Sequence, residues 1–207
     1  MSKPLIIALP KGRLGKASFA WFEGSAPLPF DDRRLRALNA SHTIEYLWVK
    51  PSDVLHYVEA GVADLGIVGD DILEESLPDV YRLKRLPFGH CRLVVAGQTR
   101  APLSDKDGLK VATKYPRTAE RYFKARRQKV SLIPLQGSVE LAPLVGLADA
   151  IIDIVETGST LEANALYVQE ELSRSQAVLI ANKAKYRWSY DTITHLIQGV
   201  DPDDAMV

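Results

Sequence analysis

Short runs of apolar residues alternate with segments in which apolar residues recur at helical intervals through most of the chain. Apolar runs that are rich in β-branched residues and bounded by Gly or Pro predict buried strands, and the segments between them predict amphipathic helices. The expected strands cover residues 5–9, 42–49, 63–68, 80–86, 93–96, 109–113, 130–135, 150–155 and 177–181. The expected helices cover residues 14–22, 51–60, 117–127, 139–147 and 186–198, with two more that begin near Asp70 and Ser159. This alternation predicts an α/β fold with mostly parallel sheets.

The segment from Gly97 to Gly108 is rich in Gly, Pro, Ser, Asp and Lys, which is typical of a linker or a surface loop. We therefore expect a domain boundary just before it and a return crossing near residues 173–176. This division predicts a discontinuous first lobe of residues 1–95 and 176–207, and a second lobe of residues 96–175.

The composition is that of an ordinary globular protein, with 46% hydrophobic and 25% charged residues. The 26 Lys and Arg residues balance the 26 Asp and Glu residues, so no overall basic field favours nucleic acid or membrane. Cys91 is the only cysteine, which excludes an internal disulfide, and the four histidines lack the spacing of metal ligands. The first residues lack the features of a signal peptide, and no apolar run reaches the roughly 20 residues of a membrane helix. We expect a cytoplasmic protein.

The most informative segment is 149–161, in which a buried strand leads through acidic residues into a hydroxyl-rich turn and a helix. Free backbone N–H groups at a helix N-terminus favour a phosphate, although the dipole supplies only about 0.3–1 kcal/mol, so hydroxyls have to contribute. An acidic side chain beside the turn can reach a sugar's hydroxyls or a magnesium shell. Together they suit a ribose 5-phosphate group, although a capped helix explains the same pattern. The candidate residues are Asp153, Glu156, Thr157, Gly158, Ser159 and Thr160.

Three cations follow predicted strands. Lys11 and Arg13 flank Gly12 directly after the first strand, and Lys50 follows another strand just before Pro51. A glycine between cations at a strand end lets backbone and charge approach an anion together, which suits a pyrophosphate. Taken singly, a Lys-Gly-Arg segment is more commonly a solvated surface turn, and Lys50 is explained at least as well as a surface lysine.

Two further segments carry candidate polar residues. Gly137 and Ser138 can begin a helix with Glu140 in its first turn, where a glutamate also interacts favourably with the helix dipole alone. Lys114 and Tyr115 follow another predicted strand. The tyrosine ring can stack on a purine, or it can be a packing residue with a solvated hydroxyl.

Read together, these motifs closely resemble the ATP phosphoribosyltransferase family of histidine biosynthesis. The resemblance covers nearly the whole chain in the family's order. A lone Thr-Gly-Ser-Thr turn would be weak evidence, but this ordered set of motifs is specific. The matching segments are Ile7–Leu14, Asp53–Leu73, Cys91–Ala96, Val111–Pro116 and Gly137–Asn164.

The resemblance implies two α/β lobes similar to periplasmic binding proteins, with the active site in the cleft between them. It implies that the phosphate turn holds the 5-phosphate, that Asp153 binds the ribose, and that the strand-end cations face pyrophosphate or the phosphates of ATP. The implied catalytic residues are Lys11, Arg13, Lys50 and Glu140. The implied substrate-binding residues are Asp71, Tyr115, Asp153, Glu156, Thr157, Gly158, Ser159 and Thr160.

The implied reaction is a glycosyltransferase reaction, the transfer of the 5-phosphoribosyl group from phosphoribosyl pyrophosphate to N1 of ATP, which releases pyrophosphate. Mg²⁺ is expected to bind mainly through the substrates' phosphates. The length of 207 residues matches short-form members, which lack a C-terminal regulatory domain. The resemblance to short-form members implies that this chain forms a homodimer, which assembles with a regulatory subunit resembling histidyl-tRNA synthetase.

Two other readings share parts of the pattern. A small-molecule binding module with the same two-lobe fold and no catalytic activity is the main alternative. A phosphoribosyltransferase that acts on another base could share the acidic strand and the hydroxyl-rich turn. A binding module would usually show a secretion signal or a fused DNA-binding segment, and this sequence shows neither. Another phosphoribosyltransferase would not be expected to match the Pro-Lys-Gly-Arg and Gly-Ser-Val-Glu-Leu-Ala-Pro segments in this order.

Overall fold

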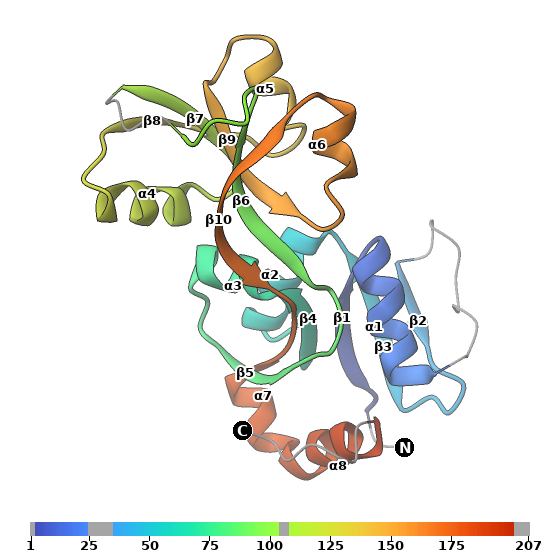
Figure 1. Ribbon diagram of the computed structural model, residues 1–207. Helices are drawn as coiled ribbons and strands as arrows, with labels where there is room; N and C mark the ends of the chain where they lie inside the picture. The colour runs from blue at the N-terminus through green and yellow to red at the C-terminus, as the bar shows by residue number, and fades with distance from the viewer. Residues whose placement is uncertain (1–2, 25–34, 104–107, 201–207) are drawn as a thin grey trace. The chain divides into compact units, whose positions relative to one another are not determined.

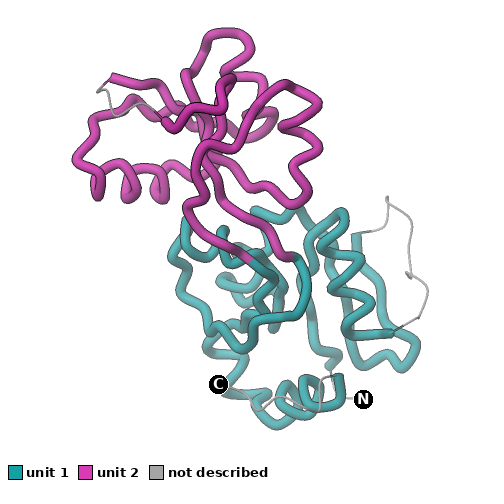
Figure 2. The backbone as a smooth tube through the Cα atoms, in the orientation of Figure 1, with its two compact units in different colours: residues 1–89, 176–207 teal, residues 90–175 magenta. Residues whose placement is uncertain are grey.

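The computed structural model describes residues 3–24, 35–103 and 108–200, and the chain divides into two compact units (Figure 2). Unit 1 comprises residues 1–89 and 176–207, and unit 2 comprises residues 90–175. The boundary expected at residue 95 would cut β6 (Cys91–Gly97), which pairs along its length within unit 2. The chain therefore crosses before β6, and the loop after Gly97 lies inside unit 2. Residues 104–107 of that loop lie outside the described residues.

Unit 1 is built on a mixed sheet with the strand order β2-β3-β1-β4-β11-β5 (Figure 1). Its parallel strands are β1 (Leu5–Pro10), β3 (Ile44–Val49) and β4 (Leu65–Gly69). Its antiparallel strands are β2 (Arg36–Leu38), β5 (Val80–Arg85) and β11 (Ala177–Asn182).

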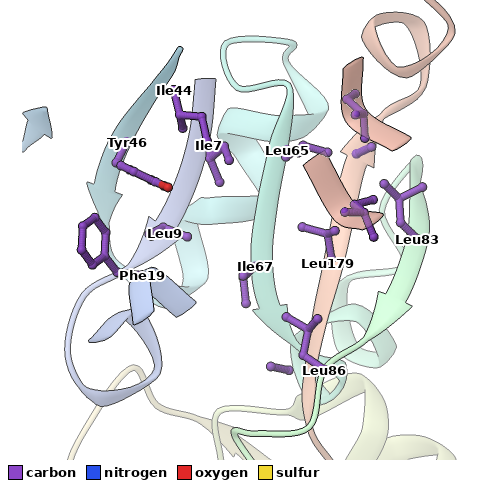
Figure 3. Packing of buried hydrophobic residues seen from close by; sticks show 14 of the residues in the cluster. Ile7, Leu9, Phe19, Ile44, Tyr46, Leu65, Ile67, Leu83, Leu86 and Leu179 are labelled. Carbon is purple, nitrogen blue, oxygen red and sulfur yellow. The ribbon is translucent and has the colours of Figure 1, made fainter. Parts of the chain in front are cut away.

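Helices cover both faces of this sheet because β1, β3 and β4 present apolar side chains on both sides. On one face, Phe19 of α1 (Arg13–Glu23) packs with strand residues such as Ile7 (Figure 3). Ile193 of α8 (Tyr190–Val200) belongs to the same cluster. On the other face, α2 (Val54–Glu59), which follows the short helix η1 (Pro51–Asp53), and α3 (Asp70–Ser76) contribute apolar side chains to the cluster around Ala8.

The C-terminal helical segment of unit 1 differs from its prediction. The single helix expected over residues 186–198 is two helices, α7 (Lys183–Trp188) and α8, which meet at Ser189. Asn182 begins α7 because its side chain accepts a hydrogen bond from the backbone N–H of Lys185 at 3.0 Å.

In the described ranges, no helix is long and apolar enough to cross a membrane.

Unit 2 is built on a second mixed sheet with the strand order β10-β6-β9-β7-β8 (Figure 1). Strands β7 (Leu109–Thr113), β8 (Val130–Pro134) and β9 (Ala150–Val155) are parallel, and β6 and β10 (Tyr167–Ser175) are antiparallel to their neighbours. On one face of the sheet, α4 (Pro116–Ala125) buries Phe123. On the other face, α5 (Leu141–Leu144) and α6 (Ser159–Ala163) bury Ala142 and Leu161.

The predicted α/β class is confirmed, but the expectation of mostly parallel sheets is corrected. In each sheet only three adjacent strands among the described residues run parallel, β3-β1-β4 in unit 1 and β9-β7-β8 in unit 2. The strands next to the two chain crossings, β5, β6, β10 and β11, run against their neighbours. As a result, each unit has one sheet edge where the carboxyl ends of three parallel strands meet, which is the usual location of sites in α/β proteins.

Candidate active site

In unit 2, segments that are distant in the sequence bring Lys114, Glu140 and Asp153 together at the carboxyl edge of the sheet. Thr113 is opposite both Ile152 of β9 and Pro134 of β8, so the ends of β7, β8 and β9 lie side by side. The Lys114 Nζ lies 3.4 Å from Asp153 Oδ2, although the two residues are 39 positions apart. The charge of Glu140 also acts on the Asp153 carboxyl.

Asp153 is a carboxylate in an unusual environment because it is only 4% exposed. Its Oδ1 accepts a hydrogen bond from the backbone N–H of Ile154 at 2.9 Å. Burial raises the pKa of Asp153, the nearby charge of Lys114 and the Ile154 N–H lower it, and the charge of Glu140 raises it, with a net upward shift. Asp153 is therefore an acceptor whose ionisation depends on its neighbours.

The sequence shows Lys114 as a cation directly after a predicted strand but does not by itself assign it to the site. The buried Thr113 hydroxyl donates to the carbonyl oxygen of Ile152 at 2.7 Å and accepts from the backbone N–H of Tyr115 at 2.8 Å. These bonds fasten the end of β7 to β9 and hold Lys114 beside Asp153. Its position directly after a strand, the feature that singled out Lys11 and Lys50, was the signal that could have identified it.

The predicted phosphate turn forms the connection between β9 and α6. Gly158 has φ +87°, a left-handed conformation that glycine adopts without strain. The Thr157 and Ser159 hydroxyl oxygens lie 3.0 Å apart, and the backbone N–H of Ser159 points to Thr157 Oγ1 at 3.4 Å. Because α6 has only five residues, its dipole is weak, and the exposed hydroxyls are the main polar groups of the turn. The exposed residues of the turn are Glu156, Thr157, Ser159 and Thr160.

Glu140 and Tyr115 occupy positions that differ from those expected. Glu140 immediately precedes the short helix α5 as its N-cap residue, whereas a first-turn position was expected. Tyr115 is 6% exposed and belongs to the apolar cluster of α4 and the sheet. Its ring is thus a packing residue in this structure, one of the two alternatives that the sequence left open, and its stacking on a purine stays a prediction.

In unit 1, the three predicted cations lie at the carboxyl edge of β1 and β3. The last residues of these strands are paired, and the backbone N–H of Lys11 donates to the carbonyl oxygen of Val49 at 2.8 Å. Lys11 and Lys50 are therefore neighbours along this edge, Arg13 begins α1, and all three residues are exposed. The sequence did not single out Gly15, at which an added Cβ would lie 1.7 Å from the carbonyl oxygen of Pro10. Glycine there lets α1 pack against the end of β1.

Asp71 reaches the same edge of unit 1 through α3, which follows β4. The preceding residue, Asp70, is anchored by Arg82 at 3.2 Å and by Arg85 at 2.9 Å. These ion pairs fix the first turn of α3 and leave Asp71 half-buried at its start. An added Cβ at Gly69 would lie 2.1 Å from Asp71 Oδ1, so the glycine is required for this side-chain position.

Comparison with known proteins identifies the family. The family model described as HisG, ATP phosphoribosyltransferase, matches residues 50–201. The chain belongs to the ATP phosphoribosyltransferase family. An ATP phosphoribosyltransferase of Clostridioides difficile is 48% identical over 198 residues, which cover 94% of this chain and 95% of the relative. One from Sorangium cellulosum is 46% identical over 202 residues, which cover 96% of this chain and 95% of that relative.

Solved structures support the same relationship. The ATP phosphoribosyltransferase (HisG:HisZ) complex of Thermotoga maritima includes a chain with 31% identity and a TM-score of 0.79, and the match covers 97% of this chain and all of that one. The periplasmic aliphatic sulphonate binding protein SsuA of Escherichia coli matches with a TM-score of 0.63 and 16% identity, over 97% of this chain and 72% of SsuA. The likeness to SsuA concerns the fold alone and confirms the predicted resemblance to periplasmic binding proteins.

Membership in the ATP phosphoribosyltransferase family confirms the activity that the motifs predicted. That activity transfers the 5-phosphoribosyl group of phosphoribosyl pyrophosphate to ATP in the first step of histidine biosynthesis. The alternative of a binding module without catalysis is not favoured. The matches cover 95% of the length of each of these two relatives.

Proposed function

We propose that the carboxyl edge of the unit 2 sheet binds the ribose 5-phosphate part of phosphoribosyl pyrophosphate. The observation that supports this most strongly is the buried carboxylate of Asp153 two residues from the end of β9, which leads directly into the exposed hydroxyls of the turn. The residues assigned to the 5-phosphate are Glu156, Thr157, Gly158, Ser159 and Thr160.

Asp153 then binds the ribose. A carboxylate that is largely withdrawn from water forms strong hydrogen bonds, so the ionised side chain is a suitable acceptor for the two vicinal hydroxyls of the sugar. Lys114 balances its charge at 3.4 Å. The charge of Glu140 acts on the same carboxyl, so we assign Glu140 to the ribose as well, beside the hydroxyls that Asp153 binds.

In unit 1, the cations at the ends of β1 and β3 bind the pyrophosphate group. Lys11 and Lys50 are adjacent because their strands are paired, and Arg13 follows within the same turn. Three exposed cations on one edge can neutralise the negative charge that accumulates on a departing pyrophosphate. Asp71, at the end of the next strand in the sheet, is assigned to the nucleotide, and Tyr115 of unit 2 retains that assignment as a prediction.

The chemistry is a displacement at the anomeric carbon of the ribose. The lone pair of the neutral adenine N1 forms the new N–C bond, while the C–O bond to pyrophosphate breaks and its electron pair stays on the leaving group. A neutral ring nitrogen needs no prior deprotonation, so no Ser, Cys or His nucleophile is required. The protein's contribution is alignment of the two substrates and stabilisation of the leaving group.

Magnesium enters this scheme with the substrates. Within residues 3–24, 35–103 and 108–200, no three His, Cys, Asp or Glu side chains are grouped so that they could hold a metal ion. The Asp153 carboxylate already contacts the ammonium group of Lys114, which disfavours a second cation there. These residues therefore do not fit a dedicated metal site, and Mg²⁺ is expected as the counter-ion of the substrate phosphates.

The chain is proposed to work with a regulatory partner. The solved relative from Thermotoga maritima is a HisG:HisZ complex, which supports a comparable hetero-oligomer here. We expect a homodimer of this chain to assemble in the cytoplasm with a subunit that resembles histidyl-tRNA synthetase. Activity that rises when such a subunit is added, together with inhibition by histidine, is the expected result of a mixing experiment. Full activity and histidine inhibition in the isolated chain would contradict the dependence.

Mass spectrometry of the reaction products tests the proposed function. The chain is incubated with ATP, phosphoribosyl pyrophosphate and Mg²⁺, with and without the regulatory subunit. We expect a phosphoribosyl-ATP adduct that is absent when either substrate is omitted. No adduct under any of these conditions would contradict the proposal and would favour the binding-module alternative.

A further inference from the structure

A pocket of about 420 Å³ lies in unit 2 beside the turn that we assign to the 5-phosphate. Thr157 and Gly158 of the turn line it, and so do two arginines. One is Arg92 of β6, and the other is Arg100, whose guanidinium group lies over the Tyr167 ring at 4.7 Å from its centroid. The turn from Glu156 to Thr160 contains no cation of its own. The pocket therefore brings guanidinium groups to a turn that has no positive group for the proposed dianionic ligand, and of the two arginines Arg92 is the one that is not stacked on an aromatic ring.

The strand register explains why Arg92 reaches this pocket. In the pairing of β6 with β9, Arg92 is opposite Val155, which is two residues before Thr157. Val94 and Ala96 are two and four residues after Arg92 on β6, so they share its face of the sheet. Both pack in the cluster that contains Val155 of β9 and Leu161 of α6. Because side chains alternate between the faces of a strand, Arg92 emerges on the face that carries the turn and α6.

The contacts of Arg92 leave it able to change partners. Its Nη1 lies 3.3 Å from Glu171 Oε2, and its side chain is 42% exposed. Glu171 is held more closely by a second arginine, since Arg174 Nε lies 3.0 Å from Glu171 Oε1. Arg174 is also the first cause of the lowered pKa of Glu171, ahead of Arg92. Departure of Arg92 would thus leave Glu171 with a cationic partner.

We propose that Arg92 binds the 5-phosphate of phosphoribosyl pyrophosphate, and that it exchanges Glu171 for the phosphate when the substrate binds. A planar guanidinium group can donate two parallel hydrogen bonds to a phosphate, which a lysine cannot do. Arg174 keeps Glu171 paired during this exchange. The inference rests on the proposed function of unit 2 and adds a residue to its phosphate site.

Calorimetric titration with phosphoribosyl pyrophosphate and with ribose 5-phosphate tests this inference on the full chain. Arg92→Gln is expected to weaken both ligands by about 10- to 100-fold, the loss typical of a hydrogen bond to a charged group. Arg92→Lys should retain part of the affinity. Glu171→Gln should tighten both ligands because it releases Arg92. ATP, which lacks a free 5-phosphate, should bind the Arg92 variants as it binds the wild type.

Arg174→Gln is the matched control, because Arg174 shares Glu171 with Arg92 but does not line the pocket. It should weaken binding by less than about threefold, well below the loss expected for Arg92→Gln. The inference is overturned if Arg92→Gln and Arg92→Lys leave the affinity unchanged, or if Arg174→Gln causes an equal loss. It is also overturned if only phosphoribosyl pyrophosphate is affected, since Arg92 would then act on the pyrophosphate end.

The same titrations separate this inference from the proposed function. Thr157→Val and Gly158→Ala change the turn itself. If these two variants weaken binding and Arg92→Gln does not, the turn is the phosphate site and only the role of Arg92 is wrong. If none of the three changes the affinity, the assignment of the turn is wrong and the role of Arg92 is overturned with it.

Discussion

The ammonium group of Lys114 lies 3.4 Å from the carboxylate of Asp153, and that carboxylate is only 4% exposed. Two opposing influences meet at this contact. Burial favours the neutral acid and raises the pKa of Asp153, whereas Lys114 favours the carboxylate and lowers it. Because the proposed ribose contact requires the carboxylate, the pair links the pH of the medium to substrate binding.

Lys114→Met is expected to shift the pH dependence of the enzyme. Without the lysine, the pKa of Asp153 rises further, so the acidic limb of the pH profile of kcat/KM for phosphoribosyl pyrophosphate should move to higher pH. Lys110→Met removes a similar charge from β7, the strand that Lys114 follows, and should leave the limb in place. An unchanged acidic limb in Lys114→Met would contradict the role given to this pair.

Asp153→Asn should stabilise the fold while it impairs function. A carboxyl group whose pKa is raised by folding binds protons more tightly in the folded state, so its contribution to stability falls as pH rises above the ordinary aspartate range. The amide is never ionised, and at neutral pH the variant should gain about 1 kcal/mol in urea unfolding. The gain should disappear at pH values below the ordinary pKa of aspartate, where both states of the wild type are protonated. A loss of stability at neutral pH would refute this account of Asp153.

Gly69→Ala should mimic the loss of Asp71. The new methyl group would meet Asp71 Oδ1 at 2.1 Å, so the carboxylate has to leave its position at the start of α3. Steady-state kinetics of the two single variants and the double variant form a double-mutant cycle. We expect Gly69→Ala and Asp71→Ala to raise the KM for ATP similarly, and we expect the double variant to be no worse than Asp71→Ala. Additive effects of the two substitutions on the KM for ATP would contradict this prediction, because they would show that Gly69 does not act through Asp71.

Lys11→Ala should lower turnover more than substrate affinity. Loss of a preorganised positive group at the departing pyrophosphate is expected to reduce kcat by about 10²–10³. Lys16→Ala serves as the control, because Lys16 is also an exposed lysine and lies in the adjoining helix α1. A decrease in kcat of less than a few-fold for Lys11→Ala would make Lys11 a surface charge.

The sequence predicts those parts of the fold that local patterns determine. The bounds of β7 and β9 agree with their apolar runs, and a buried strand followed by polar residues identified the candidate edges of both sheets. β10 was missed because its sequence mixes polar and apolar residues, and two register shifts interrupt its alternation. β10 is a strand because it pairs with β6, and the local sequence pattern does not reveal that pairing.

Tertiary geometry accounts for what the sequence did not predict in the site. The contact between Lys114 and Asp153 depends on the register of β7 with β9, and nothing local to either residue specifies that register. Gly15 and Gly69 are required by atoms of neighbouring residues that only the folded chain brings close. The burial of Tyr115 likewise depends on the packing of α4, so its ring could not be assigned to packing or to a ligand beforehand.

The central claim, that the turn between β9 and α6 binds the 5-phosphate, is tested most directly by titrating Gly158→Ala with ribose 5-phosphate in a calorimeter. Gly108→Ala is the matched control, because Gly108 has the same φ of +87° but precedes β7 at the opposite edge of the sheet. Both substitutions impose about 1–2 kcal/mol of backbone strain. The account predicts roughly tenfold weaker binding for Gly158→Ala and wild-type affinity for Gly108→Ala. Equal affinities in the two variants and the wild type would contradict it.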